Sequence, residues 1–354
     1  MHRVALVVLL GLVFAVPGRA SLYQPDDPMP FPASASGAIE PLPFDEFKRR
    51  LIVTMNQFNP LPLTEGQKNP DRDGRIARIA DRKKNPKPTT LDTLALASDL
   101  LSVAQADEAL SLVKPLDNPR RPDYLVSATL AHVHAMRQEW GTAVEKLRSV
   151  TVFGDAEMPP TVKGLSKAQR DWVERLDRDY VLSYFDLKSK EGKIDPEAEN
   201  VPPLFPLVER NKPHAPVRFV NDRNEYEPGT IAAAEKAKLP PDAIAVVQQM
   251  VLWFPGDTSL YWLLAELYSA DGQINEALVI LKECADTRKY SGRRLLMEHR
   301  GALMAEVEKR KRDEDDKRQK AFPVSLRMIA IYFGIVAVVG VWAAVRAVRR
   351  RRRA

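Results

Sequence analysis

The chain has 354 residues, of which 28% are charged and 45% hydrophobic, and its formal net charge is +6 at pH 7. This composition is ordinary for a globular protein and excludes a collagen-like or wholly disordered chain. The positive charge belongs to the two ends, because leaving out Arg3, Arg19 and the six C-terminal arginines brings the net charge to about −2. We therefore expect no nucleic-acid partner. Cys284 is the only cysteine, which excludes an internal disulfide and a thiolate metal cluster.

The first 20 residues have the features of a signal peptide. Arg3 precedes an apolar run from Val4 to Val16, and the small residues Gly18 and Ala20 suit cleavage before Ser21. As a helix this run would be about 20 Å long, short of the roughly 30 Å of a bilayer's hydrocarbon core. The pattern predicts export of the chain, with an uncleaved anchor as the alternative.

Residues 21–89 are expected to form a Pro-rich leader that contains one short helix. Between 21 and 43 proline, alanine and serine dominate without an apolar period, which predicts an extended segment that reaches rather than packs. Residues 44–55 place apolar side chains at mostly three- and four-residue spacing, so we expect one helix that docks on the first repeat. Residues 69–76 match the first half of an EF-hand loop, but Ala80 stands where the last carboxylate ligand belongs. We expect a polar turn there and no calcium site.

A period of 34 residues runs through the middle of the chain. Ala109 and Ala143 are 34 residues apart, and so are Ala243 and Ala277. An aliphatic residue follows each of these alanines four positions later. A fixed period of this length is typical of repeat proteins built from pairs of helices.

The unit from Thr258 to Ser291 resembles the tetratricopeptide repeat (TPR), whose aromatic, Leu, small, Tyr, Gly, Ala and apolar positions fall at Tyr261, Leu264, Ala265, Tyr268, Gly272, Ala277 and Leu281. Three further units match in part, at Leu96, Ala97 and Ala109, at Leu130, Ala131, Ala143 and Leu147, and at Ala243. In this pattern, small residues let the two helices of a repeat approach closely. The resemblance implies an all-α fold, a TPR-like α-solenoid of helix-turn-helix repeats. One TPR-like pair would span 90–157, and a second pair with a terminal helix would span 230–307.

An insertion over 158–229 separates the two pairs. Ser166 and Gln169 have the spacing of a capping box that begins one long helix, and a proline-rich irregular loop follows. Beyond the second pair, residues 308–323 alternate in charge without an apolar face, which predicts a solvated helical stalk.

A second strongly hydrophobic segment lies near the C-terminus. Residues 328–345 carry no charge, and Arg346 and the arginines at 349–353 follow at once. This pattern predicts a transmembrane helix over 324–348 and an arginine-rich cytoplasmic tail over 349–354, because positive charge is retained on the cytoplasmic side. The chain would then be a single-pass membrane protein with an exported, periplasmic or extracytoplasmic ectodomain, and its tail would meet anionic lipid head groups. The absence of any Asn-x-Ser/Thr sequon favours a bacterial envelope.

The TPR resemblance also implies a concave binding surface on the first helix of each repeat. The partner-binding groove would be lined by Leu125, His132, Met136, Trp262, Glu266 and Ser269. A rigid aromatic such as Trp262 is a typical anchor for a bound peptide, although packing on a neighbouring helix is an equal alternative. His132 and His134 point to different faces of one helix and do not form a metal site, and His134 takes a core position.

The sequence shows no recognisable pattern of a nucleophile with a base, of paired catalytic carboxylates or of metal ligands. Cys284 is expected to be a buried, inert thiol. We therefore expect a non-enzymatic TPR scaffold, with neither cofactor nor metal, that mediates protein–protein interaction at the outer face of a membrane. An accessory or regulatory subunit of an envelope enzyme or transporter complex is the alternative.

Overall fold

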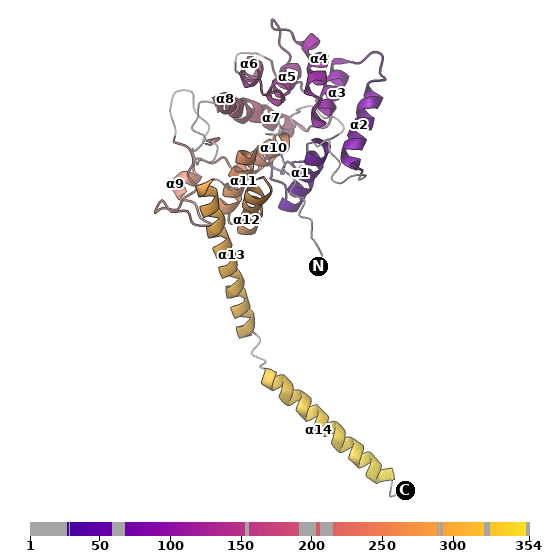
Figure 1. Cartoon of the computed structure of the whole chain (residues 1–354), viewed down its shortest axis with the longest axis vertical. Coiled ribbons are helices and arrows are strands. Elements are labelled where there is room, and N and C mark those ends of the chain that lie inside the picture. Colours follow the sequence, from indigo (N-terminus) through magenta and orange to yellow (C-terminus); the bar gives the residue numbers. More distant parts are fainter. Residues whose placement is uncertain are drawn as a thin grey trace, which may run out of the picture. The chain divides into compact units, whose positions relative to one another are not determined.

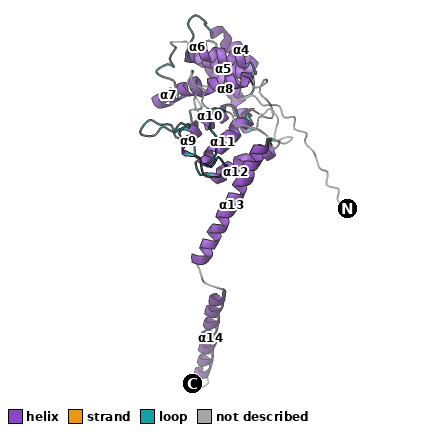
Figure 2. Ribbon diagram, turned by 90° about the vertical axis from the view of Figure 1, so that its left-hand side faces the viewer, coloured by secondary structure: helices purple, strands orange, loops and turns teal. Residues whose placement is uncertain are grey.

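The computed structural model describes residues 27, 29–58, 68–152, 156–190, 203–205, 215–288, 290, 293–321 and 326–351. In this part of the chain the regular elements are helices, and no β-strand occurs (Figure 1 and Figure 2). The prediction of an all-α protein is therefore confirmed. The chain divides into two compact units, Met1–Leu303 and Met304–Ala354. The predicted signal peptide lies outside the described residues.

Three helical hairpins recur in the first unit. They are α3 (Thr90–Ser102) with α4 (Ala106–Val113), α5 (Tyr124–Met136) with α6 (Trp140–Thr151), and α11 (Thr258–Ala270) with α12 (Ile274–Lys282). The two helices of each hairpin pack on each other, and α4 also packs on α5 (Figure 1). Small side chains permit this close approach, and the alanines of the 34-residue pattern are at most 1% exposed at Ala97, Ala109, Ala131, Ala143, Ala265 and Ala277.

Each hairpin begins with a capping residue and has a residue with positive φ in the turn between its two helices. The first helices are capped by side chains that accept a hydrogen bond from the backbone N–H three residues later, namely those of Thr89, Asp123 and Asp257. Between the two helices one residue of each hairpin has a positive φ, 65° at Ala104, 61° at Gln138 and 83° at Gly272. Glycine adopts this left-handed conformation without a steric penalty, which explains the glycine of the best-matching unit.

The N-terminal helices are α1 (Phe44–Phe58) and α2 (Pro70–Arg82), which pack on each other and on α3. The first turn of α2 is the segment that resembles half of an EF-hand loop. Asn69 caps it by accepting a hydrogen bond from the N–H of Arg72 at 3.1 Å, and Asp71 and Asp73 suit the positive end of the helix dipole. The expected polar turn is therefore wrong, because the same polar residues begin a helix. Among the described residues, no group of three or more His, Cys, Asp or Glu side chains could hold a metal ion.

The described leader residues before α1, which are 27 and 29–43, pack against the helices. From here on, the leader means this stretch before α1. Phe31, Ile39 and Leu42 are 0%, 5% and 6% exposed. The N–H of Leu42 donates to Oε1 of Gln248 at 2.8 Å, and Nε2 of Gln248 donates to the Leu42 carbonyl at 2.9 Å. The prediction of a segment that reaches rather than packs is wrong here. Its few apolar residues follow no period, yet each of these three has a buried place.

The insertion contributes one long helix made of α7 (Lys167–Arg175), the π-helical segment η2 (Leu176–Val181) and α8 (Leu182–Lys190). The predicted capping box is present, since the N–H of Gln169 donates to Oγ of Ser166 at 3.3 Å and the N–H of Ser166 donates to Oε1 of Gln169 at 2.9 Å. Both η2 and α8 pack on α6. The insertion therefore covers part of the hairpin before it.

The second repeat region is less regular than the first. Helix α10 (Ala243–Trp253) packs on α11, but the helix before it is only the single turn α9 (Ala233–Lys236). Helix α1 was expected to dock on the first repeat. It packs on α10 as well as on α3, so it contacts both repeat regions. The short segments η1 (Lys114–Leu116) and η4 (Glu283–Thr287) extend α4 and α12.

Two helices complete the described chain. Helix α13 (Arg294–Ala321) joins the predicted terminal helix and the predicted stalk, and α14 (Leu326–Arg351) follows it in sequence. The large apolar side chains of α14 between Ile331 and Trp342 are 53–69% exposed. Within the residues that the structure describes, no helix combines the length and the apolar character needed to cross a membrane.

Candidate functional site

The residues that the sequence placed in an open groove are buried. The exposed fraction is at most 5% for Leu125, His132, Met136, Trp262, Glu266 and Ser269. His132 and Glu266 are each the centre of a separate cluster of side chains. An accessible groove at these positions is therefore not present in the described structure, because other segments of the same chain cover the first helices of the hairpins.

The first cluster surrounds His132 on α5. Its ring centroid lies 5.5–6.0 Å from those of three aromatic side chains, Phe185 of α8 and Trp253 and Phe254 of α10 and its C-terminal end. The nearest carboxylate is that of Asp177 in η2, whose Oδ1 is 3.8 Å from Nε2 of His132. Oδ2 of Asp177 accepts a hydrogen bond from the Tyr124 hydroxyl at 2.9 Å, and burial, followed by the Asp177 charge, raises the pKa of Tyr124 well above its usual value. In the described structure neither ring nitrogen of His132 has a hydrogen-bond partner.

The second cluster surrounds Glu266 on α11. Its Oε1 accepts hydrogen bonds from Nε1 of Trp262 at 2.6 Å and from Nδ1 of His299 at 2.8 Å. The His299 ring on α13 is stacked on Tyr226 with centroids 3.5 Å apart, and the Tyr226 hydroxyl is 3.1 Å from Oγ of Ser269. Trp262 is thus held by its own helix and covered, and it is not a free anchor for a peptide.

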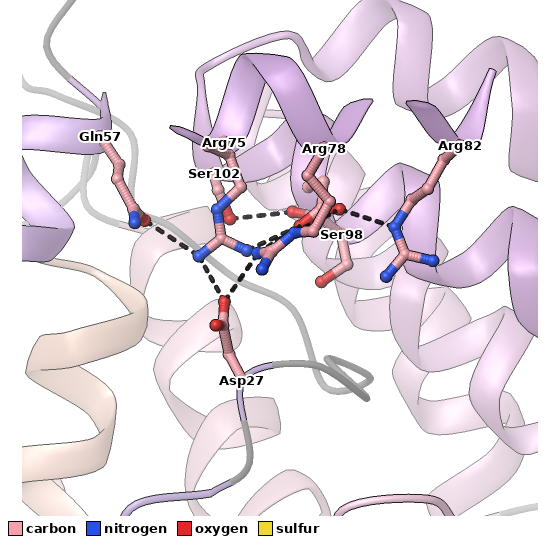
Figure 3. A network of polar contacts seen from close by, with 8 residues as sticks. Asp27, Gln57, Arg75, Arg78, Arg82, Ser98 and Ser102 are labelled. Carbon is pink, nitrogen blue, oxygen red and sulfur yellow. Dashed lines mark hydrogen bonds and ion pairs between the residues drawn. The ribbon is translucent and has the colours of Figure 1, made fainter. Parts of the chain in front are cut away.

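A third cluster, which the sequence did not reveal, joins α2 to α3 (Figure 3). Arg75, Arg78 and Arg82 approach the carboxylate of Asp99, with N–O distances of 2.6 Å from Arg75, 2.9 Å from Arg78 and 2.9 Å from Arg82. The side chains of Arg75 and Asp99 are each 3% exposed. The three arginines are three and four residues apart, so they share one face of α2. This spacing is the one signal in the sequence that could have indicated the cluster.

Two more segments join this arginine cluster. Arg75 donates from Nη2 to Oε1 of Gln57 on α1 at 3.1 Å, and Arg78 donates to Oδ2 of Asp27 in the leader at 2.9 Å. Arg75 also pairs with Asp27. Burial raises the pKa of Asp99, while the charges of Arg78 and Arg82 act in the opposite direction. The cluster therefore ties the leader, α1, α2 and α3 together through buried charge.

The residues of the TPR-like pattern lie in the interior, as packing residues would. Tyr261, Leu264, Tyr268 and Leu281 are 0–2% exposed, and Leu96, Leu130, Leu147 and Ala243 are 9%, 1%, 0% and 5% exposed. Gly272 is at the turn between α11 and α12. His134 is half-buried, with Nδ1 2.6 Å from Oε2 of Glu139. Cys284 is buried, and burial raises the pKa of its thiol to about 12, so the thiolate is not formed at neutral pH.

No protein-family model, curated protein or solved structure matches the chain. The three clusters place charged and aromatic side chains between helices. Their hydrogen bonds, ion pairs and ring contacts hold other segments of the chain against the hairpins. The arginine cluster differs from the other two because part of it, Arg78 and Asp27, is 30% and 37% exposed.

Proposed function

We propose that this chain is a non-enzymatic, TPR-like α-solenoid scaffold that binds proteins at the outer face of a membrane. The observation that carries the proposal is the repeated hairpin, in which α3–α4, α5–α6 and α11–α12 begin at equivalent caps and bury equivalent alanines. Repeats of this kind bury a continuous core only by stacking on their neighbours, and they offer extended surfaces to protein ligands.

The proposed anchor is the segment 324–348, and its support comes from the sequence and from surface exposure. Residues 328–345 carry no charge and precede Arg346 and the arginines at 349–353. The large apolar side chains of α14 between Ile331 and Trp342 are exposed on the isolated chain, and a contiguous apolar surface of this kind is typical of a lipid or protein contact. Together with a signal peptide over 1–20, this arrangement would export the ectodomain of a bacterial envelope protein and leave the tail in the cytoplasm.

Membrane attachment is tested by carbonate extraction and protease accessibility of the full-length chain. We expect the chain to sediment with membranes at high pH and a tag after residue 354 to be protected from protease added at the outer face. A tag between residues 34 and 37, which lie in an exposed turn, should be cleaved off. Release of the chain by carbonate, or protection of both tags, would contradict the proposed topology.

Partner binding is tested by affinity co-purification from detergent. We expect a stoichiometric protein partner that remains bound when residues 324–348 are replaced by an unrelated apolar helix. If replacing the native span is enough to lose the partner, the accessory-subunit alternative is favoured, in which the span makes the contact. If no protein partner is recovered from either chain, the scaffold proposal fails.

A further inference from the structure

Asp27 and residues 29–31 of the leader lie in a site built by α2 and α7. Asp27 pairs with Arg75 and Arg78, as Figure 3 shows. Nε2 of Gln169 donates to the carbonyls of Met29 at 3.3 Å and Phe31 at 2.9 Å. The Phe31 ring is fully buried, with its centroid 5.4 Å from that of Trp172. We call Arg75, Arg78, Gln169 and Trp172 the leader clamp.

The leader clamp suits a proline-rich extended segment. The leader has proline at positions 25, 28, 30 and 32, and because proline has no N–H, the carbonyls of such a segment take their hydrogen bonds from outside it. Gln169 supplies this donor to two carbonyls two residues apart. Aromatic side chains with a neighbouring donor are the common receptor for proline-rich segments. Trp172 is itself fixed, since its Nε1 donates to Oδ2 of Asp242 at 2.6 Å.

The leader clamp also selects for negative charge. Arg75, Arg78 and Arg82 share the two carboxylates of Asp99 and Asp27. Without Asp27, Arg75 and Arg78 would each lose one of the two carboxylates that they contact, and Arg75 is 3% exposed. A buried charge that loses a partner is strongly disfavoured. The occupant of the leader clamp must therefore bring an acidic group to this end.

We propose that the leader clamp is a binding site for an acidic, proline-rich extended segment, and that the leader is its internal ligand. A protein partner would carry an acidic residue four positions before an aromatic one, as Asp27 and Phe31 are placed, and would exchange for the leader. The attached leader competes at a high effective concentration, so its release controls access. The inference rests on the proposed scaffold function and names the chemistry of its partner.

Peptide exchange on the full-length chain tests this inference. The probe is a fluorescent peptide of residues 24–34, and the readout is fluorescence anisotropy in detergent. We expect Phe31→Ala in the chain to loosen the attached leader and to tighten peptide binding by about tenfold or more relative to the unaltered chain. Adding Arg78→Ala to this variant should reduce the gain, and a peptide with Asp27→Asn or Phe31→Ala should not show it.

Proteolysis and circular dichroism of the same variants complete the test. The Phe31→Ala chain should keep its helicity and be cut within residues 27–43 faster than the unaltered chain. If the leader is released but the peptide binds no better, or if it is not released, the inference is overturned. Binding that depends on neither Asp27 nor Phe31 overturns it as well. A partner that co-purifies although exchange fails leaves the scaffold function intact, whereas exchange without any partner refutes the scaffold function alone.

Discussion

Asp257 combines a helix cap with a buried ion pair, and its removal should be costly. Its Oδ1 accepts hydrogen bonds from the N–H groups of Ser259 at 2.8 Å and Leu260 at 3.0 Å. Its Oδ2 accepts from the Tyr184 hydroxyl at 2.8 Å and pairs with Nζ of Lys188 at 2.7 Å. Loss of a cap costs about 1 kcal/mol, and breaking a buried pair costs about 3–5 kcal/mol. Because the Asp257 side chain is 9% exposed, we expect Asp257→Ala to lower the free energy of unfolding by about 3–5 kcal/mol.

The chain offers a matched control in Asp123. This residue caps α5 at the equivalent position, where Oδ1 accepts from the N–H of Val126 at 3.0 Å, but it is exposed and forms no such buried pair. Asp123→Ala should cost only about 1 kcal/mol. Urea unfolding of both full-length variants, monitored by circular dichroism, measures the difference in the free energy of unfolding, provided that the slope of this free energy with urea concentration is the same in both. Equal losses in the two variants would refute the contribution of the buried pair.

Three further outcomes follow from the buried charges. Burial alone would raise the pKa of Asp257, but Lys188 and the hydrogen bonds outweigh it and lower the pKa; its stabilisation is therefore complete above the ordinary Asp pKa of about 3.9 and lost as pH falls through the lower folded value. Asp257→Asn should accordingly flatten the loss of stability in urea titrations at acidic pH. Arg75→Met should cost about 3 kcal/mol by thermal unfolding, whereas Arg78→Met, at a more exposed position, should cost less than about 1 kcal/mol, and equal effects would contradict the burial argument. His132→Leu should change the free energy of unfolding by less than about 1 kcal/mol, because neither ring nitrogen has a partner in the described structure; a loss of several kcal/mol in urea would show a missed polar contact.

The hairpins could be predicted because their determinants are local and repeat. The alanines between the paired helices recur at 34 residues, and so do the caps Thr89 and Asp123. The capping box at Ser166 needs only two residues three positions apart. Signals of this kind lie within one turn or one repeat, and the sequence displays them directly.

Helix α2 was missed because its buried face is charged. Its apolar residues include only two large ones, Ile76 and Ile79, and Ile76 is exposed. A search for apolar periodicity cannot find a helix whose inner face is made of arginines. Arg75 can be buried because Asp99 on α3 pairs with it, and this partner is known only once the tertiary structure is known.

The groove could not be judged from the repeat pattern either. The pattern fixes which face of a first helix points inward, but it does not say which segment lies on that face. His132 and Glu266 were expected to face an open groove, but the insertion covers one and α13 covers the other. The covering segments lie outside the repeats, so the 34-residue comparison carried no information about them.

Two polar residues on these inner faces are paired with the segments that cover them. Glu266 accepts a hydrogen bond from His299 of α13, and Asp99 of α3 pairs with the arginines of α2. Apolar contacts alone would allow a covering helix to slide, whereas a buried polar pair is satisfied in only one register. We infer that the covers are part of the native fold and not loosely held occupants of a groove. An incoming protein segment would then bind where the covering segment has little helical packing of its own. Among the described segments that meet these clusters, Asp27 and residues 29–31 of the leader fit this condition.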